Sequence, residues 1–315
     1  MAGVAREDGV AASIVDVIGG TPCVELSRIV AAHGVEGRLI CKLENLNPGY
    51  SKKDRIALEM VRDAKTDGRL APGQTVVELT SGNTGTGLAI VCGALGHPFV
   101  AVMSRGNSVE RARMMRALGA EVVLVDQARG SKHGEVSGDD LALVDERAKE
   151  LVDERNAFRA DQFTLESSVL AHERHTGPEL WSQTNGEVDV FVDFIGSGGS
   201  FTGVARVLKQ RKPSARAYVV DPSSPQHRIQ GGGYSIEHLA LLDESLVDGR
   251  ITVTDDDAIA CARDLARTEG VFAGFSTGAN LAAALELLRD RERGATIAFL
   301  ACDSGLKYLS TDLWD

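Results

Sequence analysis

The feature that most constrains the fold of this chain is a repeated order of elements: a short β-branched run, a glycine-rich turn, then a segment with helical period. In the first half, the strand-like runs are TVVEL at 75–79, PFVAVM at 98–103 and EVVLVD at 121–126. Helix-like segments separate these runs, and strands joined through helices pair in parallel. We therefore predict an α/β protein in which helices cover mostly parallel sheets.

The same order begins again in the second half of the chain. Strand-like runs occur there at 189–195 (DVFVDFI), 215–221 (ARAYVVD) and 296–301 (TIAFLA), and a polar stretch at 129–140 separates the two series. With 315 residues, the chain is long enough for two α/β domains of modest size.

The composition narrows the expected partners and surroundings. Lys and Arg number 34 and Asp and Glu 45, giving a formal charge of −11, and an acidic chain repels nucleic-acid backbones and anionic membranes. The five cysteines are scattered without CxxC spacing, which favours reduced thiols in a cytoplasmic protein. No run is apolar enough to cross a bilayer, and MAGVAREDGVAAS at the N-terminus lacks a signal-peptide core. His172 and His175 lack a third ligand, so zinc is a minor alternative and we expect no metal site.

The first motif with chemical potential is NPGYSKKDR at 47–55, a turn that leads into the helix-like segment IALEMVRDA. Ser51 is placed to cap this helix, which would put Lys52 and Lys53 in its first turn. The helix dipole disfavours a cation there, which lowers the pKa of an amine and suits it to form an imine with a cofactor. A solvated basic turn fits the pattern equally well, and the pattern does not choose between the two lysines.

Three further turns join a strand to a helix and are rich in small polar residues: TSGNTG at 80–85, GSGGS at 196–200 and GFSTG at 274–278. Backbone N–H groups at a helix N-terminus, together with hydroxyls, bind a carboxylate or a phosphate. Ordinary capped turns are the alternative, above all for the third. The second is not a dinucleotide fingerprint, because Phe201 stands where the third glycine belongs. A phosphorylated cofactor fits it better.

Taken together, these motifs resemble the cysteine synthase/cystathionine β-synthase family, pyridoxal-phosphate (PLP) enzymes of fold type II. The resemblance runs from about Ile18 to Thr311. NPGxSxKDR looks like the lysine motif of that family and points to Lys53, and TSGNTG looks like its substrate-carboxylate loop. GSGGS resembles its GTGGT phosphate loop, and GFSTGA its GISSGA segment. The threonine dehydratase branch is less similar, because Asp54 and Arg55 follow the lysine here.

The resemblance implies a role for each motif. Lys53 would hold PLP as an imine and later move the α-proton of the substrate. The implied cofactor-binding residues are Lys53, Asn83, Gly196, Ser197, Gly198, Gly199, Ser200 and Ser276, the last facing the ring nitrogen. The implied substrate-binding residues are Thr80, Ser81, Gly82, Asn83, Thr84 and Gln162.

The resemblance also implies an architecture: two three-layer α/β domains in a homodimer. Residues 1–42 and 155–315 would form a large PLP-binding domain. Residues 43–154 would form a smaller mobile domain that closes over the substrate and excludes water.

The implied reaction is β-replacement on an O-activated L-serine, O-acetyl- or O-phosphoserine, through an aminoacrylate, with sulfide giving L-cysteine by default. A different nucleophile making a non-protein amino acid, and a β-eliminating lyase or deaminase, are alternatives. A non-catalytic PLP-binding paralogue is disfavoured by Lys53 and TSGNTG. Arg105 and Arg228 are either readers of an anionic leaving group or nucleophile, or exposed loop arginines. The motifs leave both the leaving group and the nucleophile open.

Overall fold

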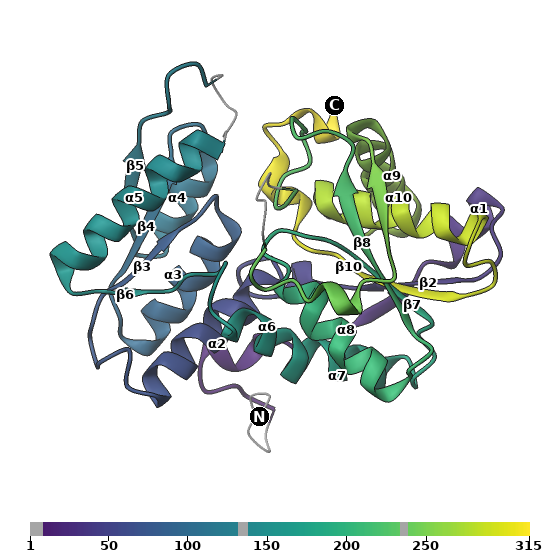
Figure 1. Cartoon of the computed structure of the whole chain (residues 1–315), viewed down its shortest axis with the longest axis horizontal. Coiled ribbons are helices and arrows are strands. Elements are labelled where there is room, and N and C mark those ends of the chain that lie inside the picture. The colour runs from purple at the N-terminus through teal and green to yellow at the C-terminus, as the bar shows by residue number, and fades with distance from the viewer. Residues whose placement is uncertain (1–8, 132–137, 234–238) are drawn as a thin grey trace. The chain divides into compact units, whose positions relative to one another are not determined.

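The structure is a computed structural model that describes residues 9–131, 138–233 and 239–315 (Figure 1). It divides into two compact units. Unit 1 lies within residues 1–18 and 53–168, and unit 2 within residues 19–52 and 169–315. The division falls between Lys52 and Lys53, so the two adjacent lysines belong to different units.

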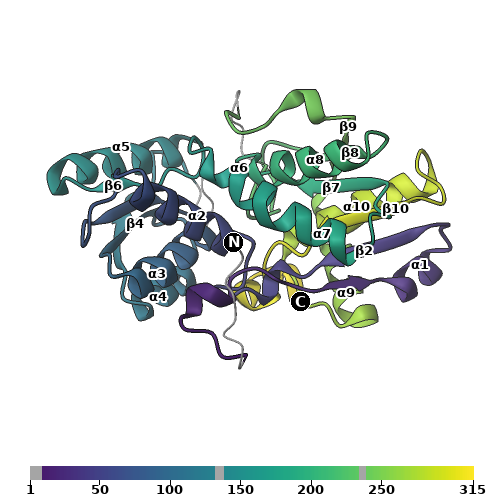
Figure 2. The same cartoon turned by 90° about the horizontal axis from the view of Figure 1, so that it is seen from below.

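Unit 1 is built around a four-stranded parallel sheet. The strand order is β5 (Glu121–Val125), β4 (Phe99–Ser104), β3 (Val76–Leu79) and β6 (Phe158–Arg159). Its helices are α2 (Lys53–Thr66), α3 (Asn83–Leu95), α4 (Val109–Ala117) and α5 (Gly138–Arg155). Figure 2 shows α5 on one face of this sheet and α3 and α4 on the other, so the unit has three layers.

Unit 2 is built around a six-stranded sheet. The strand order is β1 (Cys23–Glu25), β2 (Arg38–Lys42), β10 (Thr296–Leu300), β7 (Val190–Phe194), β8 (Arg216–Pro222) and β9 (Gly249–Val253). Only the β1–β2 pair of this sheet is antiparallel. Its helices are α1 (Ser27–His33), α7 (Gly177–Gln183), α8 (Gly199–Arg211), α9 (Asp255–Glu269) and α10 (Phe275–Arg289), while α6 (Ser167–Ala171) crosses the division between the units.

Alternating side chains of the central strands explain the layers of unit 2. Val192 and Phe194 pack in a core with α9 and α10, whereas Phe191 and Ile195 pack in a second core with α8. Figure 1 shows α9 and α10 on one side of the sheet and α7 and α8 on the other. A strand covered on both faces is apolar at nearly every position, which is why these runs were recognisable in the sequence.

The structure confirms the predicted fold class and the six predicted strands, whose ends shift by at most one residue. The prediction that Lys52 lies in the first turn of a helix capped by Ser51 is wrong, because α2 begins at Lys53. Ser51 instead forms a β-bridge with Asp303, and the Lys52 N–H donates to the carbonyl of Cys302 at 2.9 Å. These bonds tie Ser51 and Lys52 to a distant segment of unit 2, ahead of the helix. The two domains expected from the sequence have other limits than the compact units and stay a prediction.

Within the described residues, none of the helices has both the length and the apolar character that a membrane crossing needs. Part of the polar stretch at 129–140 falls at 132–137, outside the described residues.

Candidate active site

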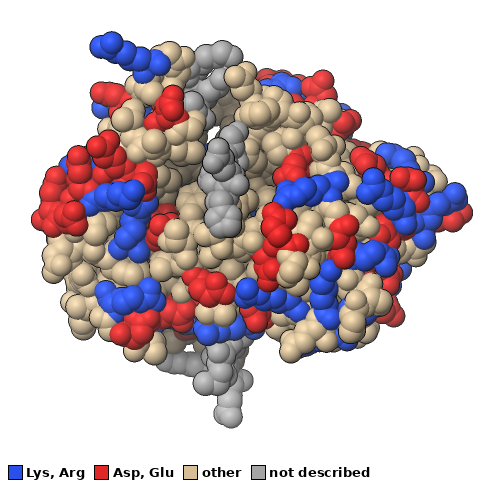
Figure 3. Space-filling view, viewed as in Figure 1, with Lys and Arg blue, Asp and Glu red and all other residues tan. Residues whose placement is uncertain are grey.

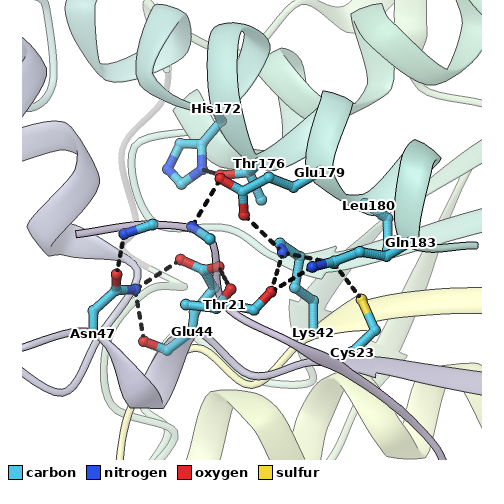
Figure 4. A network of polar contacts seen from close by, with 12 residues as sticks. Thr21, Cys23, Lys42, Glu44, Asn47, His172, Thr176, Glu179, Leu180 and Gln183 are labelled. Atoms are coloured by element: carbon cyan, nitrogen blue, oxygen red, sulfur yellow. Dashed lines mark hydrogen bonds and ion pairs between the residues drawn. The ribbon is translucent and has the colours of Figure 1, made fainter. Parts of the chain in front are cut away.

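The turn that leads to the two lysines is held by a buried polar network of unit 2 (Figure 4). Asn47 accepts a hydrogen bond from the Gly19 N–H at 2.8 Å and donates to Glu44, which also accepts from the Thr21 hydroxyl at 2.6 Å. Tyr50 adopts a left-handed conformation with φ of 62°, and its N–H donates to the Asn47 carbonyl. Directional bonds therefore fix the shape of this turn.

Lys42 extends the same network to α7. Its ammonium group is fully buried and lies 2.9 Å from a carboxylate oxygen of Glu179, and it donates to the Thr21 carbonyl and to Gln183 (Figure 4). His172 bonds Thr176 at 2.9 Å within a π-helical turn, so the structure gives this histidine a side-chain partner. The network anchors α7 to the end of β2, from which the lysine turn starts.

Lys52 and Lys53 have different surroundings. The ammonium group of Lys52 is buried and contacts Asp193 and Ser200 in unit 2. Burial opposes the charge of Lys52, but the Asp193 carboxylate outweighs it and holds the pKa of that amine above its ordinary range. Lys53 is half-buried and opens α2 in unit 1. The amine of Lys52 is thus already engaged in an ion pair.

The Thr80–Gly85 turn is built around the hydroxyl of Thr80. This oxygen accepts hydrogen bonds from the N–H groups of Gly82 and Gly85 at 3.0 and 2.9 Å, so its O–H is left to act as a donor. Gly82 has φ of 144°, and a Cβ there would lie 2.5 Å from the Arg111 side chain. Arg111 in turn donates to the carbonyl of Ser81 at 2.8 Å. The turn is held by these bonds and leads into α3, which begins at Asn83.

Gln162 belongs to the same site in unit 1. Its amide oxygen accepts from the Thr84 hydroxyl at 2.5 Å, and its amide nitrogen donates to Glu78 and to the Leu79 carbonyl, both at 3.3 Å. Glu78 is fully buried in β3, and burial raises its pKa to about 8, although Arg159 lies 3.2 Å away. The carboxyl group of Glu78 therefore orients the amide that Thr84 meets. Sequence reasoning missed Glu78, whose signal is a lone charge inside an apolar strand.

Close packing of α3 on α2 brings the Thr80–Gly85 turn and the start of α2 at Lys53 together in unit 1. A Cβ at Gly87 would lie 3.1 Å from both the Lys53 carbonyl oxygen and the Asp54 Cα, so the two backbones nearly touch. The structure thus places these predicted site residues in unit 1: Lys53, Thr80, Ser81, Gly82, Asn83, Thr84 and Gln162.

The Gly196–Ser200 turn of unit 2 depends on small residues. Gly198 is the N-cap of α8 with φ of 87°, and a Cβ there would lie 2.9 Å from Leu242. A Cβ at Gly196 would lie 3.0 Å from the Gly231 carbonyl oxygen. Gly198 has no side chain, so no side-chain cap bonds the first N–H groups of α8. N–H groups at a helix N-terminus can bind an anion.

Ser276 lies in the first turn of α10 and is buried. A Cβ at Gly231 would lie 3.8 Å from its hydroxyl oxygen, so Ser276 and Gly196 both adjoin the backbone of Gly231. The structure places these predicted site residues together in unit 2: Gly196, Ser197, Gly198, Gly199, Ser200 and Ser276.

The two arginines proposed as anion readers are engaged in ion pairs at the surface. Arg228 pairs with Asp255, Asp256 and Asp312, and Arg105 pairs with Asp126 at 2.6 Å. Acidic and basic side chains are interspersed on the face seen in Figure 3. These pairs favour the exposed-loop interpretation for both arginines.

Comparison with known proteins identifies the family of the chain. Residues 14–303 match the family described as pyridoxal-phosphate dependent enzyme. A cysteine synthase of Staphylococcus aureus is 37% identical over 312 residues, 96% of each chain. A hydrogen sulfide-producing enzyme from Fusobacterium nucleatum superposes with a TM-score of 0.87 at 37% identity, covering 95% of this chain and 100% of that one. An O-ureido-L-serine synthase gives a TM-score of 0.86 at 37% identity, covering 96% and 95%. This chain therefore belongs to the pyridoxal-phosphate-dependent enzymes of fold type II, in the cysteine synthase group.

Proposed function

We propose that this protein catalyses β-replacement on an O-activated L-serine and that its default product is L-cysteine from sulfide. The observation that carries the proposal is the packing of α3 on α2, which keeps Lys53 and the Thr80–Gly85 turn in one unit. A reacting amine and a carboxylate-binding turn carried by two helices packed on each other suit an amino-acid substrate. The S. aureus cysteine synthase supports the same choice.

The residues fit the cofactor. The Gly196–Ser200 turn, with its uncapped helix N-terminus, would hold the 5′-phosphate. Asn83 would bond the ring hydroxyl, Ser276 the ring nitrogen, and Lys53 the carbon of the aldehyde. When bound, PLP supplies a ring that withdraws electrons from the α-carbon of an amino acid.

The side chains around the substrate would have separate roles in the reaction. The Lys53 amine would remove the α-proton and return it. Thr80, Thr84 and Gln162 would hold the substrate carboxylate, together with the backbone of Ser81, Gly82 and Asn83. Because the hydroxyl of Ser276 is neutral, it stabilises a protonated ring nitrogen less than a carboxylate would. This favours brief carbanion character and rapid loss of the β-substituent.

The second substrate is the least determined part of the reaction. Three relatives at the same 37% identity are named for cysteine synthesis, hydrogen sulfide production and O-ureido-L-serine synthesis. Overall identity therefore does not choose the nucleophile. Two alternatives keep the same first half-reaction: a different nucleophile that yields a non-protein amino acid, and β-elimination without a nucleophile.

The expected assembly is a homodimer in the cytoplasm, with residues 43–154 moving as a closing domain. Five free thiols suit a reducing compartment. Light scattering of the purified protein tests the dimer, and fractionation of the source cells tests the location.

Substitution of Lys53 tests the proposed role of this residue. The purified protein should be yellow, and Lys53→Ala should lose its visible absorbance after dialysis against an amino acid. Activity should fall by about 10³-fold or more. Lys65→Ala is the matched control, because Lys65 lies exposed in the last turn of the same helix and should leave both properties unchanged. A colourless wild type that cannot be reconstituted with PLP contradicts the proposal.

The substrates are sorted by supplying them one at a time. O-Acetylserine and O-phosphoserine should differ in the spectral change that they produce before any nucleophile is added. Sulfide, thiols and amines are then compared by the amino acid formed. Pyruvate released without a nucleophile would instead favour the eliminase.

A further inference from the structure

Lys52 and Asp193 form a buried ion pair that contacts the predicted phosphate turn. Lys52 is 6% exposed and Asp193 is fully buried. The ammonium nitrogen lies 2.8 and 3.0 Å from the two carboxylate oxygens and 2.9 Å from the Ser200 hydroxyl oxygen. All three residues belong to unit 2.

The hydrogen bonds of this cluster are mutually satisfied. An ammonium group has three N–H donors, and its hydrogen bonds run to the two oxygens of Asp193 and the oxygen of Ser200. The thiol of Cys302 also adjoins the amine of Lys52 and helps to raise its pKa. Ser200 in turn donates its own proton to Asp193. The hydroxyl of Ser200 is therefore both an acceptor from Lys52 and a donor to Asp193.

The charges of the cluster follow from the groups around it. The thiol of Cys302 lies 3.9 Å from Asp193 and accepts from the Asn280 amide at 3.6 Å. Burial raises the pKa of this thiol to about 11, so it is neutral at physiological pH. The cluster thus holds one cation and one anion.

We propose that Lys52 and Asp193 are a positioning pair that prepares Ser200 for the phosphate of the cofactor. This rests on the proposed assignment of the Gly196–Ser200 turn to that phosphate. To bind a phosphate oxygen, Ser200 turns its proton away from Asp193. Lys52 still bonds both oxygens of Asp193, so the carboxylate keeps its partner while the hydroxyl serves the phosphate.

The consequence of losing Lys52 is electrostatic. Asp193 would then compete for the Ser200 proton and would place an uncompensated buried negative charge close to a phosphate dianion. Affinity should fall for ligands that carry the phosphate and stay the same for ligands that lack it. A pair that merely stabilises the fold makes no such distinction.

The test measures the affinity of the apoprotein for PLP and for pyridoxal, which lacks the phosphate. In Lys52→Met the affinity for PLP should fall at least tenfold, while the affinity for pyridoxal stays within twofold. Inorganic phosphate should also compete with PLP less well in this variant. The double variant Lys52→Met/Asp193→Asn removes both charges of the pair and should recover most of the preference for PLP. It also provides the test where the single variant does not fold.

Lys42→Met is the matched control, because Lys42 is the other buried lysine of the described part of unit 2 and pairs with Glu179. It should leave the ratio of PLP to pyridoxal affinity unchanged. An unchanged ratio in Lys52→Met, or a double variant as poor as the single one, overturns the role of the pair. If the wild type itself does not prefer PLP to pyridoxal, the assignment of the phosphate turn fails instead.

Discussion

Each unit has a fully buried carboxyl group in the strand that precedes its glycine-rich turn. In unit 1 it is Glu78 of β3, two residues before Thr80, and in unit 2 it is Asp193 of β7, three residues before Gly196. Each carboxyl group meets a cation from a distant segment, Arg159 or Lys52. The two turns are therefore supported by the same kind of buried pair.

The pairs differ in how many carboxyl groups the cation contacts. Arg159 divides its guanidinium group between Glu78 and Asp145, whereas both oxygens of Asp193 meet Lys52. Accordingly burial raises the pKa of Glu78 to about 8, while Lys52 is held in its charged form by Asp193. Glu78 of unit 1 therefore exchanges a proton at about pH 8, whereas Lys52 of unit 2 keeps its charge.

Removal of each carboxylate should give the largest difference between the units. Asp193→Ala leaves Lys52 buried without its carboxylate, and breaking such a pair costs about 3–5 kcal/mol of unfolding free energy. Glu78→Ala should cost clearly less, because Arg159 keeps Asp145 at 2.8 Å. Denaturant unfolding of both variants measures this, with Asp145→Ala as the control for the shared arginine. Equal losses in the two variants would remove the distinction between the pairs.

Substitutions of Gln162 and Ser200 should separate substrate binding at the first turn from cofactor binding at the second. Gln162→Ala removes the acceptor of the Thr84 hydroxyl. It should raise the KM for the amino-acid substrate about 10–100-fold, as loss of a hydrogen bond to a charged group does, with the affinity for PLP unchanged. Ser200→Ala should instead lower the affinity for PLP and leave the KM for the amino-acid substrate unchanged. Steady-state kinetics and PLP titration of the two variants measure these effects. A variant that loses both substrate binding and PLP affinity would contradict the division of tasks between the turns.

The strands and turns could be predicted because their signals are local. Each buried strand reads as an apolar run, and each turn combines glycines with hydroxyl residues at a helix start. The two carboxyl groups were visible as single charges in VVEL and VFVDF, but their partners were not. Arg159 reaches Glu78 because β6 pairs with β3 in parallel, opposite Val77. Such pairing depends on register, which the sequence alone does not specify.

The position of Lys52 could not be predicted from local sequence signals either. The local pattern favoured a capped helix that included Lys52. The β-bridge of Ser51 to Asp303 and the bond from the Lys52 N–H to Cys302 instead leave it outside the helix. Its partner Asp193 is 141 residues away in the sequence. Local propensity cannot anticipate a contact of that range, so the pattern left the choice between the two lysines open.

The pH dependence of stability should isolate the proton of the unit 1 pair. The pKa of Glu78 rises from 4.5 to about 8 on folding, because burial disfavours its charge. Between these values the folded chain keeps a proton that the unfolded chain has released. The free energy of unfolding therefore falls as the pH rises through this window, by about 1.4 kcal/mol per pH unit.

Denaturant unfolding of wild type and Glu78→Gln at several pH values isolates this contribution. The difference between the two proteins should change with pH by the stated slope and level off above pH 8 or so. Because an arginine keeps its charge throughout this range, the proton that leaves the unit 1 pair must come from Glu78. Parallel curves for wild type and Glu78→Gln would mean that Arg159 holds Glu78 ionised, and the two pairs would then be alike.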